Sequence, residues 1–236
     1  MTPEKETTKN LLQGPSKRIQ LFEVGVFLFL IMPSLVLSSF SLQQHSLTFS
    51  VFILSSILQN MALLCLVLFF IWRNQESMAS IGWTRKHPWK EGLVGIALFF
   101  PLVVGVKLLE SGLRKNGIPI PETPPDYLTP TSVDQFILAF VFLVVVAVSE
   151  EVIFRGYLIR RFINLSDRPV FSVVLAAAIF SLGHGYQGVG GIIEVGALGI
   201  VFGAIYVWRG SLWAPIVMHF LQNFIGIVVI PLQKGG

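Results

Sequence analysis

The chain has 236 residues, of which 53% are hydrophobic and only 13% are charged, with a formal net charge of +4. Soluble domains carry about 25% charged residues, so this composition excludes a soluble domain and indicates a membrane protein. The positive charge does not indicate nucleic-acid binding, because the basic residues cluster between apolar runs, as membrane topology requires. Cys65 is the single cysteine, which excludes a disulfide framework and a thiolate metal cluster.

Seven apolar runs are about long enough to cross a bilayer, which takes roughly 20 residues. They are expected to be helices, because a lipid-exposed backbone must satisfy its own hydrogen bonds. The sequence therefore predicts an all-α, polytopic transmembrane bundle of seven spans, with room for an eighth. The expected spans are residues 20–41, 47–72, 91–113, 134–163, 169–185, 190–208 and 211–231.

The chain is expected to divide into three sections. Residues 1–19 form a polar tail. Residues 20–132 hold the N-terminal spans, an interfacial segment at 74–90 with Trp and basic residues suited to a membrane surface, and a proline-rich outer loop at 114–132. Residues 133–231 form the core that holds the candidate catalytic residues.

The distribution of Lys and Arg predicts the orientation, since cytoplasmic loops carry an excess of both. Basic residues gather before the first expected span and around the ends of the second, fourth and sixth, whereas the alternate loops hold few. The N-terminus is therefore expected in the cytoplasm, and seven spans put the C-terminus outside. The basic residues behind this prediction are Lys5, Lys9, Lys17, Arg18, Arg73, Arg85, Lys86, Lys90, Arg155, Arg160, Arg161, Arg168 and Arg209.

Two adjacent carboxylates, Glu150 and Glu151, lie within the apolar run 139–162. A carboxylate near the bilayer centre costs roughly 2.5–3.5 kcal/mol, so both are functional candidates by default. Arg155 follows Glu151 by four positions, which predicts an ion pair on one helix face. Glu150 points about 100° away from Glu151, so the spacing leaves it without that partner and free to face a cavity.

Three further polar residues are candidates for the same cavity. His184 ends the run IFSLGHG, and His219 and Asn223 share one face of the last expected span. Taken alone, each is as readily a packing or interhelical hydrogen-bonding residue. A rise of about 1.5 Å per residue puts Glu150 and His184 about 20 Å from the cytoplasmic side, and the pair on the last span about 12–18 Å from it. These depths predict one polar cavity inside the membrane.

The segments EEVIFRGYL, FSLGH and HFLQN resemble the motifs EExxxR, FxxxH and HxxxN of the CAAX-protease and bacteriocin-processing family (CPBP, also called Abi). The resemblance runs from residue 150 to residue 223 and includes Phe154, Gly156 and Tyr157. It implies an intramembrane endopeptidase of the glutamic type in a bacterial cell membrane. The implied substrate is a membrane-bound protein or peptide, such as a prenylated CAAX tail or a leader peptide.

The resemblance also implies a role for each motif residue. Glu150 is expected to be the general base that activates water, with His184 sharing that water. His219 and Asn223 are expected to stabilise the oxyanion, as amide hydrolysis requires. No cofactor or metal is expected. Two charged residues are expected to orient the site, Glu151 and Arg155.

Two other functions compete with this prediction. A zinc hydrolase could use two histidines and a glutamate, although the sequence has no HExxH motif and Arg155 disfavours a cation. A non-catalytic immunity or scaffold protein, or a transporter, is the other, although the internal repeats typical of transporters are not found.

Five residues outside these motifs also give testable expectations. Lys107 and Glu110 are expected to pair near the outer end of their span. Gly199 and Gly203 form a GxxxG pair that favours close helix packing. Glu194 has no assigned role, and either faces the outer interface or lines the cavity.

Overall fold

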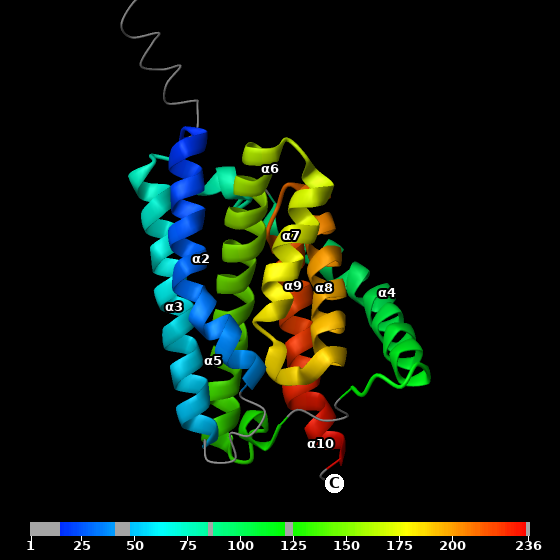
Figure 1. Cartoon of the computed structure of the whole chain (residues 1–236). Helices are drawn as coiled ribbons and strands as arrows, with labels where there is room; N and C mark the ends of the chain where they lie inside the picture. Colours follow the sequence, from blue (N-terminus) through cyan, green and yellow to red (C-terminus); the bar gives the residue numbers. More distant parts are fainter. Residues whose placement is uncertain (1–14, 41–47, 85–86, 121–124, 235–236) are drawn as a thin grey trace, which may run out of the picture.

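The structure is a computed structural model, and it describes residues 15–40, 48–84, 87–120 and 125–234. Within these residues every regular element is a helix, and the long helices run up and down through one bundle (Figure 1). The predicted all-α transmembrane bundle is confirmed. The expected tail and the proline-rich outer loop lie partly outside the described residues.

Six helical elements of the described residues are long and apolar enough to cross a membrane. The fourth passes from α5 through a π-helical segment, η3, into α6, and the last continues from α9 through η5 into α10. The helices concerned are α2 (Lys17–Phe40), α3 (Phe49–Arg73), α4 (Pro88–Lys115), α5 (Val133–Glu150), η3 (Glu151–Ile159), α6 (Arg160–Ser166), α8 (Gly188–Arg209), α9 (Trp213–Phe224), η5 (Ile225–Val229) and α10 (Ile230–Lys234).

The predicted fifth span, residues 169–185, is too short to be a complete crossing. It forms α7 (Pro169–Leu182), whose 14 residues extend about 21 Å, against a hydrocarbon core of about 30 Å. The chain then turns through η4 (Gly185–Gln187) and returns as α8. The early end of α7 places His184 inside the bundle rather than at its surface.

One end of the bundle gathers most of the basic residues and is called the basic end here. It contains the starts of α2, α4 and α9 and the ends of α3, α6 and α8 (Figure 1). The predicted interfacial segment 74–90 lies at this end, where it forms the short helix η1 (Met78–Ile81). Residues 85–86 lie outside the described residues, and α4 begins at Pro88, earlier than the predicted residue 91.

The close packing expected of the GxxxG pair is confirmed between α7 and α8. A Cβ atom on Gly199 would lie 2.9 Å from the Cβ atom of Ala177, and one on Gly203 would lie 2.8 Å from Cγ1 of Val173. Such contacts leave no room for a larger side chain without a shift of one helix. The two helices therefore hold a fixed position relative to each other.

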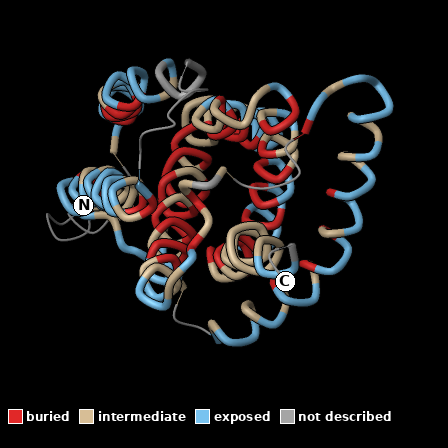
Figure 2. Tube along the Cα trace, turned by 90° about the horizontal axis from the view of Figure 1, so that it is seen from below, coloured by how far each residue is buried: buried red, intermediate tan, exposed pale blue. Residues whose placement is uncertain are grey.

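The exterior of the bundle is apolar. Buried residues concentrate on the inward sides of the helices, and exposed residues cover the outside (Figure 2). Exposed apolar area of this extent is typical of a membrane-facing surface. The large apolar side chains that are more than half exposed include Phe22, Phe29, Leu58, Phe100, Leu108, Ile137 and Val170.

Candidate active site

Glu150 and Glu151 lie where α5 passes into η3. π-Helical segments are rare and frequently occur at functional sites, but nothing in the sequence had predicted this one. Gly156 allows η3 to pack closely at this level, because a Cβ atom there would lie 2.9 Å from the carbonyl oxygen of Ile81. The motif glycine thus fixes η3 against η1.

The predicted ion pair between Glu151 and Arg155 is confirmed. Arg155 Nη1 lies 2.9 Å from Glu151 Oε1, and both side chains are buried. Neither Nη1 nor Nη2 of Arg155 makes an aligned hydrogen bond to a described residue, so the contact is ionic. Arg155 was also expected near the cytoplasmic turn, and this placement is wrong, because the residue is 1% exposed inside the bundle.

Two phenylalanine rings hold the guanidinium group of Arg155. Its Cζ atom lies 4.6 Å from the ring centroid of Phe180 and 5.4 Å from that of Phe202. Cation–π contacts are strongest where water is excluded. Since Phe180 belongs to α7 and Phe202 to α8, Arg155 links η3 to both helices.

His219 of α9 contacts both glutamates. Its Nδ1 lies 2.7 Å from Glu151 Oε1, and its Nε2 lies 3.7 Å from Glu150 Oε2. Because a carboxylate only accepts, Nδ1 carries the proton and donates it. Nε2 is then the nitrogen that faces Glu150. These four residues are called the Glu150 cluster below: Glu150, Glu151, Arg155 and His219.

Glu150 and Glu151 each have a buried Oε2 atom that receives no hydrogen bond from any described residue, but the two side chains differ in exposure. The Glu150 side chain is 16% exposed, whereas that of Glu151 is fully buried. A buried polar atom without a partner calls for an explanation. An acceptor so placed can take a proton from a water molecule.

His184 joins the Glu150 cluster through an aromatic ring. Its Nδ1 lies 3.1 Å from the carbonyl oxygen of Phe180, so Nδ1 donates and Nε2 is an acceptor that no described residue engages. The Phe180 ring lies 4.8 Å from the His184 ring and 6.2 Å from the His219 ring, measured between centroids. The rings of His184 and His219 therefore both pack against the Phe180 side chain of α7.

Asn223 lies one turn beyond His219 on α9 and is half-buried. Its side chain makes no hydrogen bond to a described residue, and the amide is therefore available to a ligand. The four residues predicted to act on the substrate come from α5, from the turn between α7 and η4, and from α9. The structure brings Glu150 and His219 into direct contact and holds the other two beside them.

Sequence reasoning missed two groups that support this site. The Ser149 hydroxyl donates to Asn60 Oδ1 at 3.0 Å, which joins α5 to α3 next to Glu150. Phe202 is the other missed group, and a phenylalanine among many in apolar spans gives no signal. Asn60 did offer one, as a strongly polar residue inside the expected span 47–72.

A second buried ion cluster at the basic end was also missed. Arg73 Nη2 lies 2.7 Å and Tyr157 Oη 3.1 Å from the carboxylate of Glu23, and Arg161 contacts both Glu23 and Glu76. The expected position of Arg161 in a cytoplasmic loop is wrong, because it is 1% exposed. These five residues are called the Glu23 cluster: Glu23, Arg73, Glu76, Tyr157 and Arg161.

The remaining intramembrane charges lie away from the Glu150 cluster. Lys107 and Glu110 form the predicted pair, with Nζ 2.9 Å from Oε2. Glu194 is half-buried on α8 and interacts electrostatically with both. It therefore belongs to this pair and not to the candidate active site.

Residues 132–225 match the family model described as type II CAAX prenyl endopeptidase Rce1-like. This part of the chain is an Rce1-like domain. It contains every residue of the Glu150 cluster together with His184 and Asn223, and it confirms the resemblance to the CPBP family. No curated protein and no solved structure matches the chain. The match supports a CAAX-type protease at the level of the family, and the six apolar helices support a multi-pass membrane protein.

Proposed function

We propose that the chain is an intramembrane endopeptidase that cleaves a membrane-associated protein or peptide with a water molecule activated by Glu150. The observation that supports this most directly is the unpaired, buried Oε2 atom of Glu150, 3.7 Å from His219 Nε2. Glu151 is less suited to this role, because Arg155 and His219 engage its Oε1 atom and its side chain is fully buried, whereas the Glu150 side chain is 16% exposed. The pair of glutamates thus divides into a reactive and an orienting member.

The reaction follows from these positions. Glu150 takes a proton from water, and the resulting hydroxide attacks the carbonyl carbon of the scissile peptide bond. His184, whose Nε2 is free, holds the water in place. The tetrahedral intermediate then collapses, the C–N bond breaks, and Glu150 returns the proton to the leaving amine.

The oxyanion of that intermediate needs hydrogen-bond donors. Asn223 offers its side-chain amide. His219 can donate from Nε2 only as an imidazolium, because its Nδ1 already donates to Glu151. Glu150 and Glu151 lie on either side of this imidazole. Arg155 in turn offsets the charge of Glu151, so the cluster stays close to neutral.

The substrate class and orientation follow from the membrane setting. Burial among apolar helices suits a substrate held at the bilayer by a prenylated CAAX tail or an apolar leader segment. The basic end lies on the cytoplasmic side, as in the positive-inside rule, with the N-terminus there. The host is a bacterial cell membrane, and residues 133–231 form the catalytic core behind residues 20–132.

The test is peptide cleavage by the purified full chain in proteoliposomes. Prenylated CAAX peptides are compared with the same peptides lacking the lipid and with apolar leader peptides. Wild type is compared with Glu150→Ala and with Glu194→Ala, a half-buried carboxylate outside the site. Peptides that co-purify with Glu150→Ala are sequenced to identify the natural substrate.

Three outcomes separate the alternatives. Loss of cleavage in Glu150→Ala but not in Glu194→Ala supports the proposal. Activity lost on strong chelation and restored by zinc identifies a metal-dependent protease instead. A cellular phenotype that survives Glu150→Ala identifies a non-catalytic immunity or scaffold protein.

A further inference from the structure

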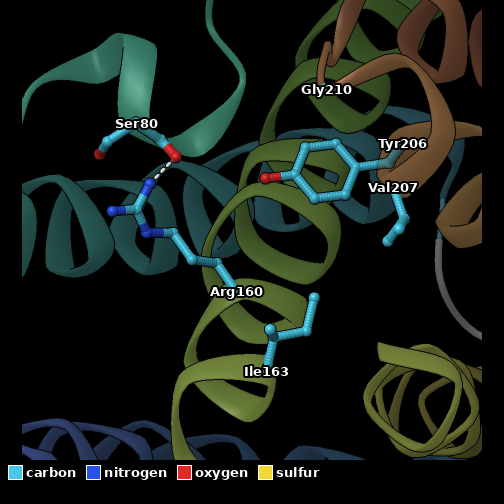
Figure 3. A pocket seen from close by; sticks show the side chains of 6 residues that line it. All are labelled: Ser80, Arg160, Ile163, Tyr206, Val207 and Gly210. Carbon is cyan, nitrogen blue, oxygen red and sulfur yellow. Dashed lines mark hydrogen bonds between the residues drawn. The ribbon is translucent and has the colours of Figure 1, made fainter. Parts of the chain in front are cut away.

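A pocket of about 200 Å³ opens at the basic end of the bundle, away from the Glu150 cluster. It lies where the start of α6, the end of α8 and η1 meet (Figure 3). Neither the proposed peptide cleavage nor its residues make use of this space. Its lining residues are Ser80, Arg160, Ile163, Tyr206, Val207 and Gly210.

The two sides of the pocket differ in chemistry. The guanidinium group of Arg160 lies on one side, where it donates to the backbone carbonyl of Ser80 (Figure 3). The ring of Tyr206 and the side chains of Ile163 and Val207 form an apolar side. The hydroxyl of Tyr206 is already used, because it donates to the carbonyl oxygen of Ile81 at 3.2 Å. Arg160 is thus the single charged group that lines the pocket.

The charge of Arg160 is incompletely paired. The nearest carboxylate, Glu76, lies 3.8 Å from Arg160 Nη2, but Arg161 contacts both oxygens of that carboxylate more closely. Arg161 is buried at 1% exposure, whereas the Arg160 side chain is 29% exposed. Arg160 therefore keeps an accessible positive charge and N–H groups that a ligand can reach.

These features point to an anionic ligand with an apolar part. Arginine is well suited to phosphate, because its planar N–H groups match two phosphate oxygens. Basic pockets between transmembrane helices near the membrane surface suit lipid head groups. The apolar side of the pocket is continuous with exposed apolar residues at the end of α8, of which Val207 is 41% and Trp208 67% exposed.

We propose that this pocket binds the phosphate of an anionic phospholipid, with Arg160 on the phosphate and the start of an acyl chain along Ile163 and Val207. The bound lipid would brace the junction of η1, α6 and α8. Arg160 directly follows η3, so the lipid sits at the cytoplasmic end of the segment that holds Glu151 and Arg155. The binding itself does not depend on the proposed catalytic function.

The experiment uses the delipidated full chain in a neutral detergent. Phosphatidylglycerol, phosphatidylcholine and inorganic phosphate are added separately, and thermal unfolding and bound lipid by native mass spectrometry are measured. We expect phosphatidylglycerol to raise the Tm and to remain bound. Arg160→Gln should bind it about 10- to 100-fold more weakly, the usual loss for one charged hydrogen-bonding group. Arg168→Gln, an exposed arginine at the same end, should bind as wild type does.

A second variant guards against misfolding of Arg160→Gln. Val207→Trp fills the apolar side of the pocket and leaves the contact between Arg160 and Ser80 in place, and it should also lose the lipid. Equal binding of phosphatidylglycerol and phosphatidylcholine, or unchanged binding in Val207→Trp, would overturn the proposal. An equal rise of the Tm with inorganic phosphate, dependent on Arg160, would show that the ligand is a soluble phosphate and not a lipid.

Discussion

The Glu150 cluster and the Glu23 cluster are both buried groups of carboxylates and cations, but they differ in how completely they are paired. In the Glu23 cluster, both oxygens of Glu23 and both oxygens of Glu76 accept hydrogen bonds. In the Glu150 cluster, one oxygen of Glu150 and one of Glu151 receive none from the described residues. Cations are present in both, so the difference lies in geometry.

This difference in pairing indicates a structural role for the Glu23 cluster and a chemical role for the Glu150 cluster. A buried ion pair contributes a fixed geometry when every lone pair is satisfied, and costs stability when one is not. The Glu23 cluster ties α2 and α3 to η3 and α6 and leaves no carboxylate oxygen without a hydrogen bond, so it offers no free base. The Glu150 cluster retains an unsatisfied acceptor beside a histidine, which stability alone does not favour. Such an arrangement is typical of a site prepared for a further molecule.

Replacement of Glu150 by glutamine should give the largest change in activity. A positioned general base contributes roughly 10²- to 10⁴-fold, so kcat should fall by about that factor. Because Glu150 Oε2 makes no hydrogen bond to a described residue, the Tm should stay within a degree or two of wild type, the spread of roughly neutral substitutions. Both quantities are measured on one preparation. A stable variant with wild-type kcat would show that Glu150 is not the general base.

Replacement of Glu23 by glutamine should give the opposite result. It removes the carboxylate that Arg73 contacts and leaves Arg161 with Glu76 alone within the cluster. Loss of one partner from a buried ion pair costs about 3–5 kcal/mol, which thermal or denaturant unfolding should detect. The kcat of the folded fraction should remain near wild type. A large fall in kcat at unchanged stability would mean that the Glu23 cluster is part of the active site.

Replacement of Glu151 by glutamine should lower both activity and stability. The variant loses the ion pair with Arg155 and the charge that holds His219 Nδ1. Partners that orient a reacting histidine typically contribute about 10- to 100-fold to activity. The unfolding free energy should fall by about 3–5 kcal/mol, because the buried Arg155 loses its ion-pair partner. An effect on kcat as large as that of Glu150→Gln would show that the two glutamates are not divided in role.

Local spacing in the sequence predicted the near contacts of the Glu150 cluster and not the distant ones. The pairing of Glu151 with Arg155 follows from helical spacing, and the family motifs indicated His184, His219 and Asn223. The contact of His219 with Glu151 spans 68 positions, and no local pattern encodes it. The sequence also did not predict the π-helical form of η3. The apolar pattern predicts a helix here, and it does not distinguish an α-helix from a π-helix.

The Glu23 cluster shows where charge patterns mislead. Arg161 follows an apolar span, and the positive-inside rule therefore predicts a solvated loop residue. The structure buries it, because Glu23, 138 positions away, supplies a countercharge. A carboxylate in the first expected span was the available signal. The length of α7 was misjudged because the predicted span continued through residues 183–185, where the structure turns after Leu182.

The smallest change in activity and stability should come from breaking an ion pair outside both clusters. This change serves as the reference for the variants of the two clusters. The Lys107 side chain is 65% exposed and pairs with Glu110 at 2.9 Å on the same helix. Exposed pairs at this spacing contribute about 0.2–0.5 kcal/mol. Lys107→Gln should therefore leave kcat unchanged. Its Tm should differ from that of wild type by much less than the Tm of Glu23→Gln does. A loss of stability comparable to that of Glu23→Gln would show that the exposed pair is as structural as the buried one. Full pairing would then not distinguish the Glu23 cluster from other charges.

Raising the salt concentration provides the control, because screening weakens exposed pairs far more than buried ones.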